Sequence, residues 1–208
     1  MDLVKKNDKK KFIVLFLWLM IYVKMNFGII RSPLLKFLSE NNQFVMYLLL
    51  SFVIIFIFRQ ELIIMFKRIT MFGVIMSIIS AFIITVVNMI FVYVVFQEIS
   101  FKPVVATGIL LMNMLVIGPV YEELIFRFLM LLNSNKRIIR ALNIFISVAL
   151  FTLAHSISYQ GNLLSMIQAS ILGILLAVVY IKTQNIYYSI LIHISYNIII
   201  TYIGIILN

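Results

Sequence analysis

Long apolar runs make up most of the chain, and short polar segments separate them. Seven runs predict membrane-spanning helices at about 12–30, 44–58, 69–96, 104–132, 141–157, 163–181 and 186–207. The second run is short, because a helix needs roughly 20 residues to cross a bilayer. The segment 61–68 is amphipathic and predicts a helix lying along the membrane interface. The pattern predicts an all-α polytopic membrane protein with about seven transmembrane helices.

Composition supports this fold class. The 208 residues are 64% hydrophobic with a mean hydropathy of +1.15, whereas soluble domains are about 45–50% apolar. The net charge of +10 could suggest nucleic acid, but the basic residues lie between the apolar runs, where they act as topology signals. The absence of cysteine excludes a thiol nucleophile and disulfides. We therefore expect the lipid bilayer as a partner and expect no nucleic acid.

The basic residues also predict an orientation. Placing the N-terminus in the cytoplasm leaves only Arg31, Lys36 and Lys102 in the outer loops. The inner segments then hold Lys5, Lys6, Lys9, Lys10, Lys11, Arg59, Lys67, Arg68, Lys136, Arg137, Arg140 and Lys182. Such asymmetry indicates the cytoplasmic side. We expect a multi-pass protein of the cell membrane with a cytoplasmic N-terminus.

The N-terminal segment resembles a signal peptide, but no small-x-small cleavage site follows 12–23, so it is interpreted as a retained first span. Spans one to three with the basic tail occupy 1–103, and spans four to seven occupy 104–208. We expect one structural domain, because no linker separates these parts.

Charged residues interrupt the fourth run in the sequence Gly118-Pro-Val-Tyr-Glu-Glu-Leu-Ile-Phe-Arg127. A charge in hydrocarbon costs several kcal/mol, so these residues need partners or a function. Glu123 and Arg127 are four apart, which predicts an ion pair on one helix face. Glu122 points about 100° away and is predicted to face an opening. Pro119 leaves a carbonyl of the preceding turn without its N–H partner and can kink the helix.

Both histidines lie in predicted spans. His193 and Asn197 are four residues apart and share a helix face, and Phe151 can shield His155 in the same way. Counting from the nearest basic residues, Glu122, His155 and His193 lie roughly 16–23 Å from the cytoplasmic boundary. Three helices can therefore bring these side chains to one level. We expect the helices to enclose a polar cavity within the membrane.

The same residues also allow a purely structural interpretation. Polar side chains in membranes often join helices through hydrogen bonds, and we assign Asn88, Asn113 and Gln168 to that role. The Glu123–Arg127 pair could likewise be a folding clamp. The matched depth of the remaining polar residues favours a site.

The three polar segments resemble the signature of the CPBP (Abi) family, over about 104–208. The matching patterns are Glu122-Glu123-x-x-x-Arg127, Phe151-x-x-x-His155 and His193-x-x-x-Asn197, in that order. Members include type II CAAX prenyl endopeptidases and bacterial bacteriocin-processing or self-immunity proteins. The resemblance implies a glutamate-dependent intramembrane protease with a conical, water-accessible cavity and no required metal.

The residues themselves point to hydrolysis by a water that a carboxylate activates. The chain has neither a Gly-x-Ser-x-Gly elbow nor His-Glu-x-x-His. We expect Glu122, with His155, to polarise the water, and His193 and Asn197 to donate to the oxyanion. Glu123 would hold Arg127 or help to bind substrate.

Other functions and ligands stay open. A Zn²⁺ ion held by Glu122, His155 and His193 is the alternative to a metal-free site. A non-enzymatic bacteriocin self-immunity or scaffold protein is the alternative to a protease. A transporter or proton pathway ranks lower, because the chain shows no repeated halves. The chain is rich in Ile, Lys and Asn, which suggests a bacterial source. We therefore expect a peptide or membrane-protein substrate, and the oligomeric state stays open.

Overall fold

The computed structural model describes residues 8–26, 43–96, 108–132, 136–156 and 162–206, and every regular element in these ranges is a helix. The helices are α2 (Asp8–Asn26), α4 (Gln43–Ile57), α5 (Arg59–Lys67), α6 (Met71–Phe96), α7 (Gly108–Met112), η1 (Asn113–Ile117), α8 (Gly118–Glu123), η2 (Leu124–Leu129), α9 (Arg137–Ser156), α10 (Leu163–Thr183) and α11 (Ile186–Ile206). The predicted all-α membrane fold is confirmed.

The number of spans differs from the prediction. Within the described residues, five helices are long and apolar enough to cross a membrane, or six if the pair α4 and α5 forms one broken span. The two helices are bent by 83° relative to each other, which fits the prediction that the segment 61–68 runs along the membrane interface. The predicted first span corresponds to α2, which carries four lysines and does not qualify; residues 27–30 of that prediction lie outside the described ranges. The predicted number of seven membrane-spanning helices is therefore approximate.

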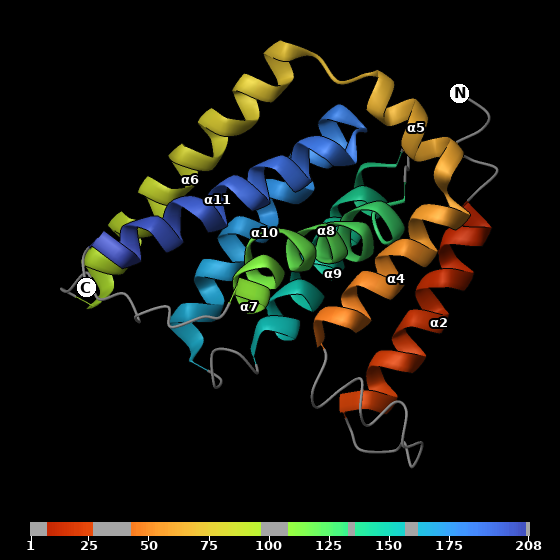
Figure 1. Ribbon diagram of the computed structural model, residues 1–208, viewed down its shortest axis with the longest axis horizontal. Coiled ribbons are helices and arrows are strands. Elements are labelled where there is room, and N and C mark those ends of the chain that lie inside the picture. Colours follow the sequence, from red (N-terminus) through yellow and green to blue (C-terminus); the bar gives the residue numbers. More distant parts are fainter. Residues whose placement is uncertain (1–7, 27–42, 97–107, 133–135, 157–161, 207–208) are drawn as a thin grey trace.

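The segment α7–η1–α8–η2 forms the central span (Figure 1). It packs against α2 and α4 on one side and against α9 and α11 on the other, and α6 lies along α11. Large apolar side chains cover the outer faces, for example Phe52 at 65% and Phe72 at 73% exposure. This surface suits hydrocarbon, because lipid tails cover apolar groups without the free-energy cost that water imposes.

The basic ends of several helices meet at one end of the molecule. Lys11 Nζ of α2 lies 3.4 Å from Glu61 Oε2 of α5. Asn185 Nδ2, in the turn between α10 and α11, donates to the Met65 carbonyl over 2.8 Å. These contacts join the start of α2, helix α5 and the end of α10, which are the segments that the charge pattern assigned to one side of the membrane.

Aromatic contacts tie the N-terminal helices to the central span. The Trp18 indole N–H donates to the Tyr121 hydroxyl, and the Trp18 ring meets Phe126 edge-on. Tyr47 of α4 stacks on Tyr121 with ring centroids 4.2 Å apart. Because Tyr121 immediately precedes Glu122, α2 and α4 help to fix the helix that carries the acidic pair.

Candidate functional site

Two π-helical stretches flank the acidic pair. In η1 the Gly118 N–H donates to the Asn113 carbonyl, five residues back, and η2 begins directly after Glu123. Single π-helical turns inside α-helices occur often at functional sites. Each such turn holds more residues than an α-helical turn and so changes the direction in which the following side chains point.

Gly118 is required by the first π-helical turn. A Cβ at this position would lie 2.8 Å from the Asn113 carbonyl oxygen, which is backbone and cannot move aside freely. We expect Gly118→Ala to lower the free energy of unfolding by about 1–3 kcal/mol, as for other overpacked sites. Thermal unfolding in detergent would measure this change.

Gly108 offers the matched control for that substitution. It lies in the same span, and a Cβ there would meet nothing within 4 Å. Gly108→Ala should therefore leave stability unchanged or raise it, since alanine favours helix over glycine by about 0.5–1 kcal/mol. Equal effects of the two substitutions would contradict the steric role of Gly118.

Glu123 and Arg127 form the predicted ion pair. Arg127 Nη1 lies 3.2 Å from Glu123 Oε1, and both side chains are fully buried. Arg127 Nη2 also donates to the Gly173 carbonyl over 3.3 Å, and its guanidinium lies 4.3 Å from the centre of the Phe151 ring. The arginine thus joins the central span to α9 and α10.

Glu123 also contacts His193, which the sequence did not indicate. His193 Nδ1 lies 3.0 Å from Glu123 Oε1 and the side chain is only 3% exposed. An ionised carboxylate can only accept, so the imidazole donates through Nδ1. Glu123 thereby fixes the ring and directs its other nitrogen, Nε2, toward Glu122.

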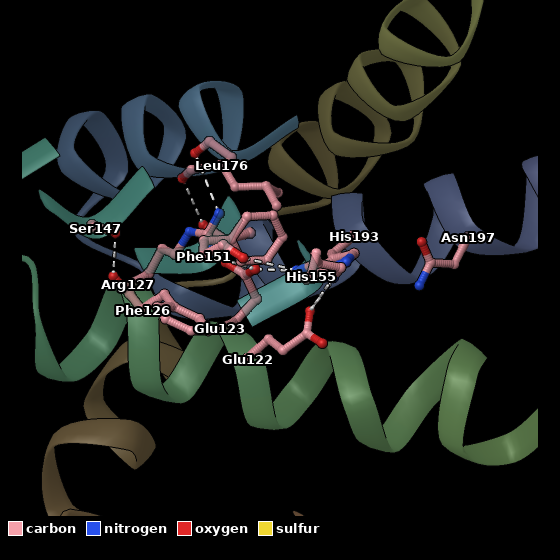
Figure 2. Close-up of polar contacts among 12 residues, drawn as sticks. Glu122, Glu123, Phe126, Arg127, Ser147, Phe151, His155, Leu176, His193 and Asn197 are labelled. Atoms are coloured by element: carbon pink, nitrogen blue, oxygen red, sulfur yellow. Dashed lines mark hydrogen bonds and ion pairs between the residues drawn. The ribbon is translucent and has the colours of Figure 1, made fainter. Parts of the chain in front are cut away.

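Glu122 is the point where the two imidazoles converge (Figure 2). Glu122 Oε2 lies 3.7 Å from His155 Nε2 and 3.7 Å from His193 Nε2. Both distances exceed a direct hydrogen bond and suit a bridging water. Glu122 and His155 are partly exposed, at 19% and 22%, whereas Glu123 is not. The two adjacent glutamates therefore have different surroundings, as the helical projection predicted.

Phe151 orients His155. His155 Nδ1 lies 2.9 Å from the Phe151 carbonyl, which can only accept, so this nitrogen carries the proton in the neutral ring. The two rings pack with centroids 4.5 Å apart, which agrees with the predicted shielding. Because Nδ1 points at the Phe151 carbonyl, the other ring nitrogen, Nε2, faces Glu122.

Asn197 lies apart from the group around Glu122. It follows His193 by one turn on α11, and its carboxamide is turned toward the central span (Figure 2). Its Nδ2 donates to the Met114 carbonyl over 2.9 Å. The structure thus brings Glu122, Glu123, Arg127, His155 and His193 together. Asn197 contacts the central span at a different place, the Met114 carbonyl.

Two supporting residues gave little signal in the sequence. Ser147 Oγ donates to the Phe126 carbonyl in η2 over 2.6 Å. At Gly173 a Cβ would lie 3.1 Å from the Phe151 ring, so a glycine lets α10 approach this ring and Arg127 closely. A serine or glycine in an apolar run has many structural uses, so neither could be selected without coordinates.

Comparison with known protein families gives a match to part of the chain. A family model described as "Type II CAAX prenyl endopeptidase Rce1-like" matches residues 103–199, just under half of the chain. No curated protein and no solved structure matches the chain. The matched segment contains every predicted site residue, and α2, α4, α5 and α6 lie outside it. The resemblance drawn from the three motifs is thus confirmed: residues 103–199 match the Rce1-like type II CAAX prenyl endopeptidase family.

Proposed function

We propose that this membrane protein is an endopeptidase in which Glu122 activates water for peptide hydrolysis. The observation that carries the proposal is the placement of one Glu122 oxygen 3.7 Å from the Nε2 atoms of both His155 and His193. The matching family, which is named for an endopeptidase, supports the same reaction class. The substrate would be a peptide or a membrane-protein segment that enters a polar cavity open to water.

The charges of the cluster support separate roles for the two imidazoles. In the proposed mechanism His193 holds a proton on each ring nitrogen, with Nδ1 facing Glu123 and Nε2 facing Glu122. His193 then donates through Nε2, and His155, which keeps a lone pair on Nε2, can accept a hydrogen bond from water.

The proposed reaction has two steps. The water oxygen attacks the scissile carbonyl carbon while its proton passes to Glu122, and His155 orients the water. His193 Nε2–H stabilises the oxyanion of the tetrahedral intermediate. The carbon–nitrogen bond then breaks, and the proton moves from Glu122 to the leaving amine. Glu123 and Arg127 do not react, and they hold His193 in place.

The assay for this proposal needs a chemically defined probe. We would use internally quenched fluorogenic peptides, one carrying a farnesylated C-terminal cysteine motif and one without a lipid, with purified protein in detergent. Wild-type protein should cleave at least one probe, and His155→Ala should lower kcat by about 10²-fold or more, as is usual for loss of a group that acts on the proton or water.

Phe145→Ala is the matched control for His155→Ala. Phe145 lies on the same helix, α9, and is 70% exposed on the outer face. Its removal should leave kcat unchanged. Wild-type turnover in His155→Ala would refute the role given to this imidazole, and no cleavage of any probe by the wild type would refute the proposed activity on these peptides.

A Zn²⁺ site remains the alternative chemistry. Glu122, His155 and His193 would be the ligands, and both Nδ1 atoms already face acceptors, as is common for metal-bound histidines. However, in the part of the chain that the structure describes, no three such side chains are spaced as metal ligands. We expect turnover to persist in EDTA. Loss of turnover with EDTA and its return with Zn²⁺ would establish the metal-dependent alternative.

A further inference from the structure

We propose that helix α5 and its C-terminal end form a binding site for an anionic phospholipid. The site consists of basic and large apolar side chains on the outer face of this helix, namely Arg59, Ile63, Phe66, Lys67 and Arg68. It lies outside residues 103–199, which match the family model. The proposal concerns the lipid that holds this end of the protein and does not depend on the proposed hydrolysis.

Helix α5 lies at the level where membrane-spanning helices end. It is bent by 83° from α4, and it forms the corner between α4 and α6, beside the start of α2 (Figure 1). Its Met65 carbonyl accepts from Asn185, which lies in the short turn between the spans Ser165–Thr183 and Ile186–Ile206. Because this turn joins two membrane-spanning helices, α5 lies at the boundary between hydrocarbon and water, where lipid headgroups are.

The inner face of α5 fixes the helix and pairs the acidic side chain of this segment. Glu61, Leu62 and Met65 are buried. Glu61 Oε2 lies 3.4 Å from Lys11 Nζ, and the Lys11 side chain is buried as well. Glu61 is the only acidic residue between positions 41 and 97 of the sequence. The exposed cations of α5 therefore have no second carboxylate from the same segment to neutralise them.

The outer face of α5 combines cations with large apolar side chains. Arg59, Ile63 and Lys67 follow one another at intervals of four residues, so they share one face of the helix. Arg59 and Lys67 are exposed, Ile63 is 52% exposed, and Phe66 is 61% exposed. The Arg59 guanidinium also lies 5.6 Å from the centre of the Phe56 ring. Such a mixture of basic and apolar side chains is typical of helices that bind lipid surfaces.

This combination favours a phospholipid over an acidic peptide. The cations Arg59, Lys67 and Arg68 can donate to phosphate oxygens, while Ile63 and Phe66 contact acyl chains. An acidic peptide from the aqueous side would use the cations and leave the two apolar side chains uncovered. Each basic side chain near an anionic leaflet tightens binding by about fivefold. The three cations together therefore set an upper limit of about 100-fold on the preference for an anionic headgroup.

The test measures lipid binding to purified protein that has been stripped of lipid in a neutral detergent. Native mass spectrometry would give the dissociation constants of dioleoyl phosphatidylglycerol and dioleoyl phosphatidylcholine. We expect the wild type to bind the anionic lipid at least about tenfold more tightly. Arg59→Gln combined with Lys67→Gln and Arg68→Gln should reduce this preference to about threefold or less. Arg59→Gln alone should lower it about fivefold, and this single variant serves if the triple variant does not fold.

Lys136→Gln combined with Arg137→Gln and Lys182→Gln is the matched control. It removes three other exposed cations, which lie at the start of α9 and the end of α10. This control should keep the preference for the anionic lipid. Equal loss in the two triple variants would show that only total charge matters and would overturn the assignment to α5. A wild type without any preference would overturn the proposal as well.

Two further probes separate a lipid from other anions. Inorganic phosphate shares the headgroup chemistry but has no acyl chains, and a hexaglutamate peptide imitates an acidic protein segment. Phosphatidylglycerol should raise the thermal unfolding midpoint of the wild type and have less effect on the α5 triple variant, because a ligand that binds the folded state stabilises it. The two soluble anions should leave the midpoint unchanged. A rise with either of them that equals the rise with lipid would overturn the proposal in favour of that anion.

Discussion

Glu122→Gln is expected to abolish peptide cleavage while the protein stays folded. Glutamine has the same shape as glutamate but cannot take a proton from water. Loss of a general base commonly lowers kcat by about 10²–10⁴-fold. Glu122 is partly exposed and its Oε2 lies 3.7 Å from the Nε2 atoms of His155 and His193, so its neutralisation leaves the buried ion pair of Glu123 and Arg127 intact.

Measuring kcat together with the thermal unfolding midpoint separates chemistry from folding. Glu61→Gln is the matched control, because Glu61 is another buried glutamate, paired with Lys11 away from the site. Glu61→Gln should lower the thermal unfolding midpoint and leave kcat per folded molecule unchanged. Glu122→Gln should lower kcat and leave the midpoint unchanged. A Glu122→Gln protein that cleaves normally would remove the carboxylate from the mechanism.

The same variant separates the enzyme from its non-enzymatic alternative. A self-immunity or scaffold protein would need the fold and not the reaction. Glu122→Gln would then support the cellular phenotype of the wild type as long as it is folded. Loss of both cleavage and phenotype, with folding retained, would favour the protease.

Local periodicity was sufficient to predict the parts of the site that lie within one helix. A spacing of four residues gave the Glu123–Arg127 pair and the packing of Phe151 against His155. Counting residues from the basic helix ends gave the common level of Glu122, His155 and His193. These rules work because helix rise and rotation are nearly constant.

Contacts between helices depended on features that a single sequence does not encode locally. Glu123 meets His193 across 70 residues, and Asn197 meets Met114 across 83. The π-helical turns rotate side chains away from their α-helical positions, and Pro119 indicated only that a carbonyl would be free. The number of spans also differs, because α2 carries four lysines and α4, with 15 residues, counts as a span only together with α5.

The Glu123–Arg127 pair is incompletely hydrogen-bonded, which bears on its purpose. Within the described residues, Glu123 Oε2 and Arg127 Nε are buried without a hydrogen-bond partner. A buried ion pair repays its desolvation only with near-ideal geometry. The ion pair therefore adds little stability by itself. The hydrogen bond between His193 Nδ1 and Glu123 gives the pair a second role, which is to orient that imidazole.

Arg127→Ala should be the most destabilising single change in the site. It leaves the fully buried Glu123 carboxylate without its cation, which costs about 3–5 kcal/mol. It also removes the donor to the Gly173 carbonyl and the cation above Phe151. Folded yield and the thermal midpoint would both fall. Arg137→Ala, an exposed arginine at the start of α9, should change stability by no more than about 0.5 kcal/mol.

A double-variant cycle shows whether the lost charge pairing causes this instability. Glu123→Gln removes the negative charge and keeps a carbonyl that can accept from His193 Nδ1. If the unpaired carboxylate is the cause, Glu123→Gln combined with Arg127→Ala should be at least about 1 kcal/mol more stable than the sum of the single effects. Additive losses would contradict this cause and would assign the effect of Arg127 to its packing against Phe151 and Gly173. Because the double variant also frees His193 from a charged partner, its kcat should stay low even where its fold recovers.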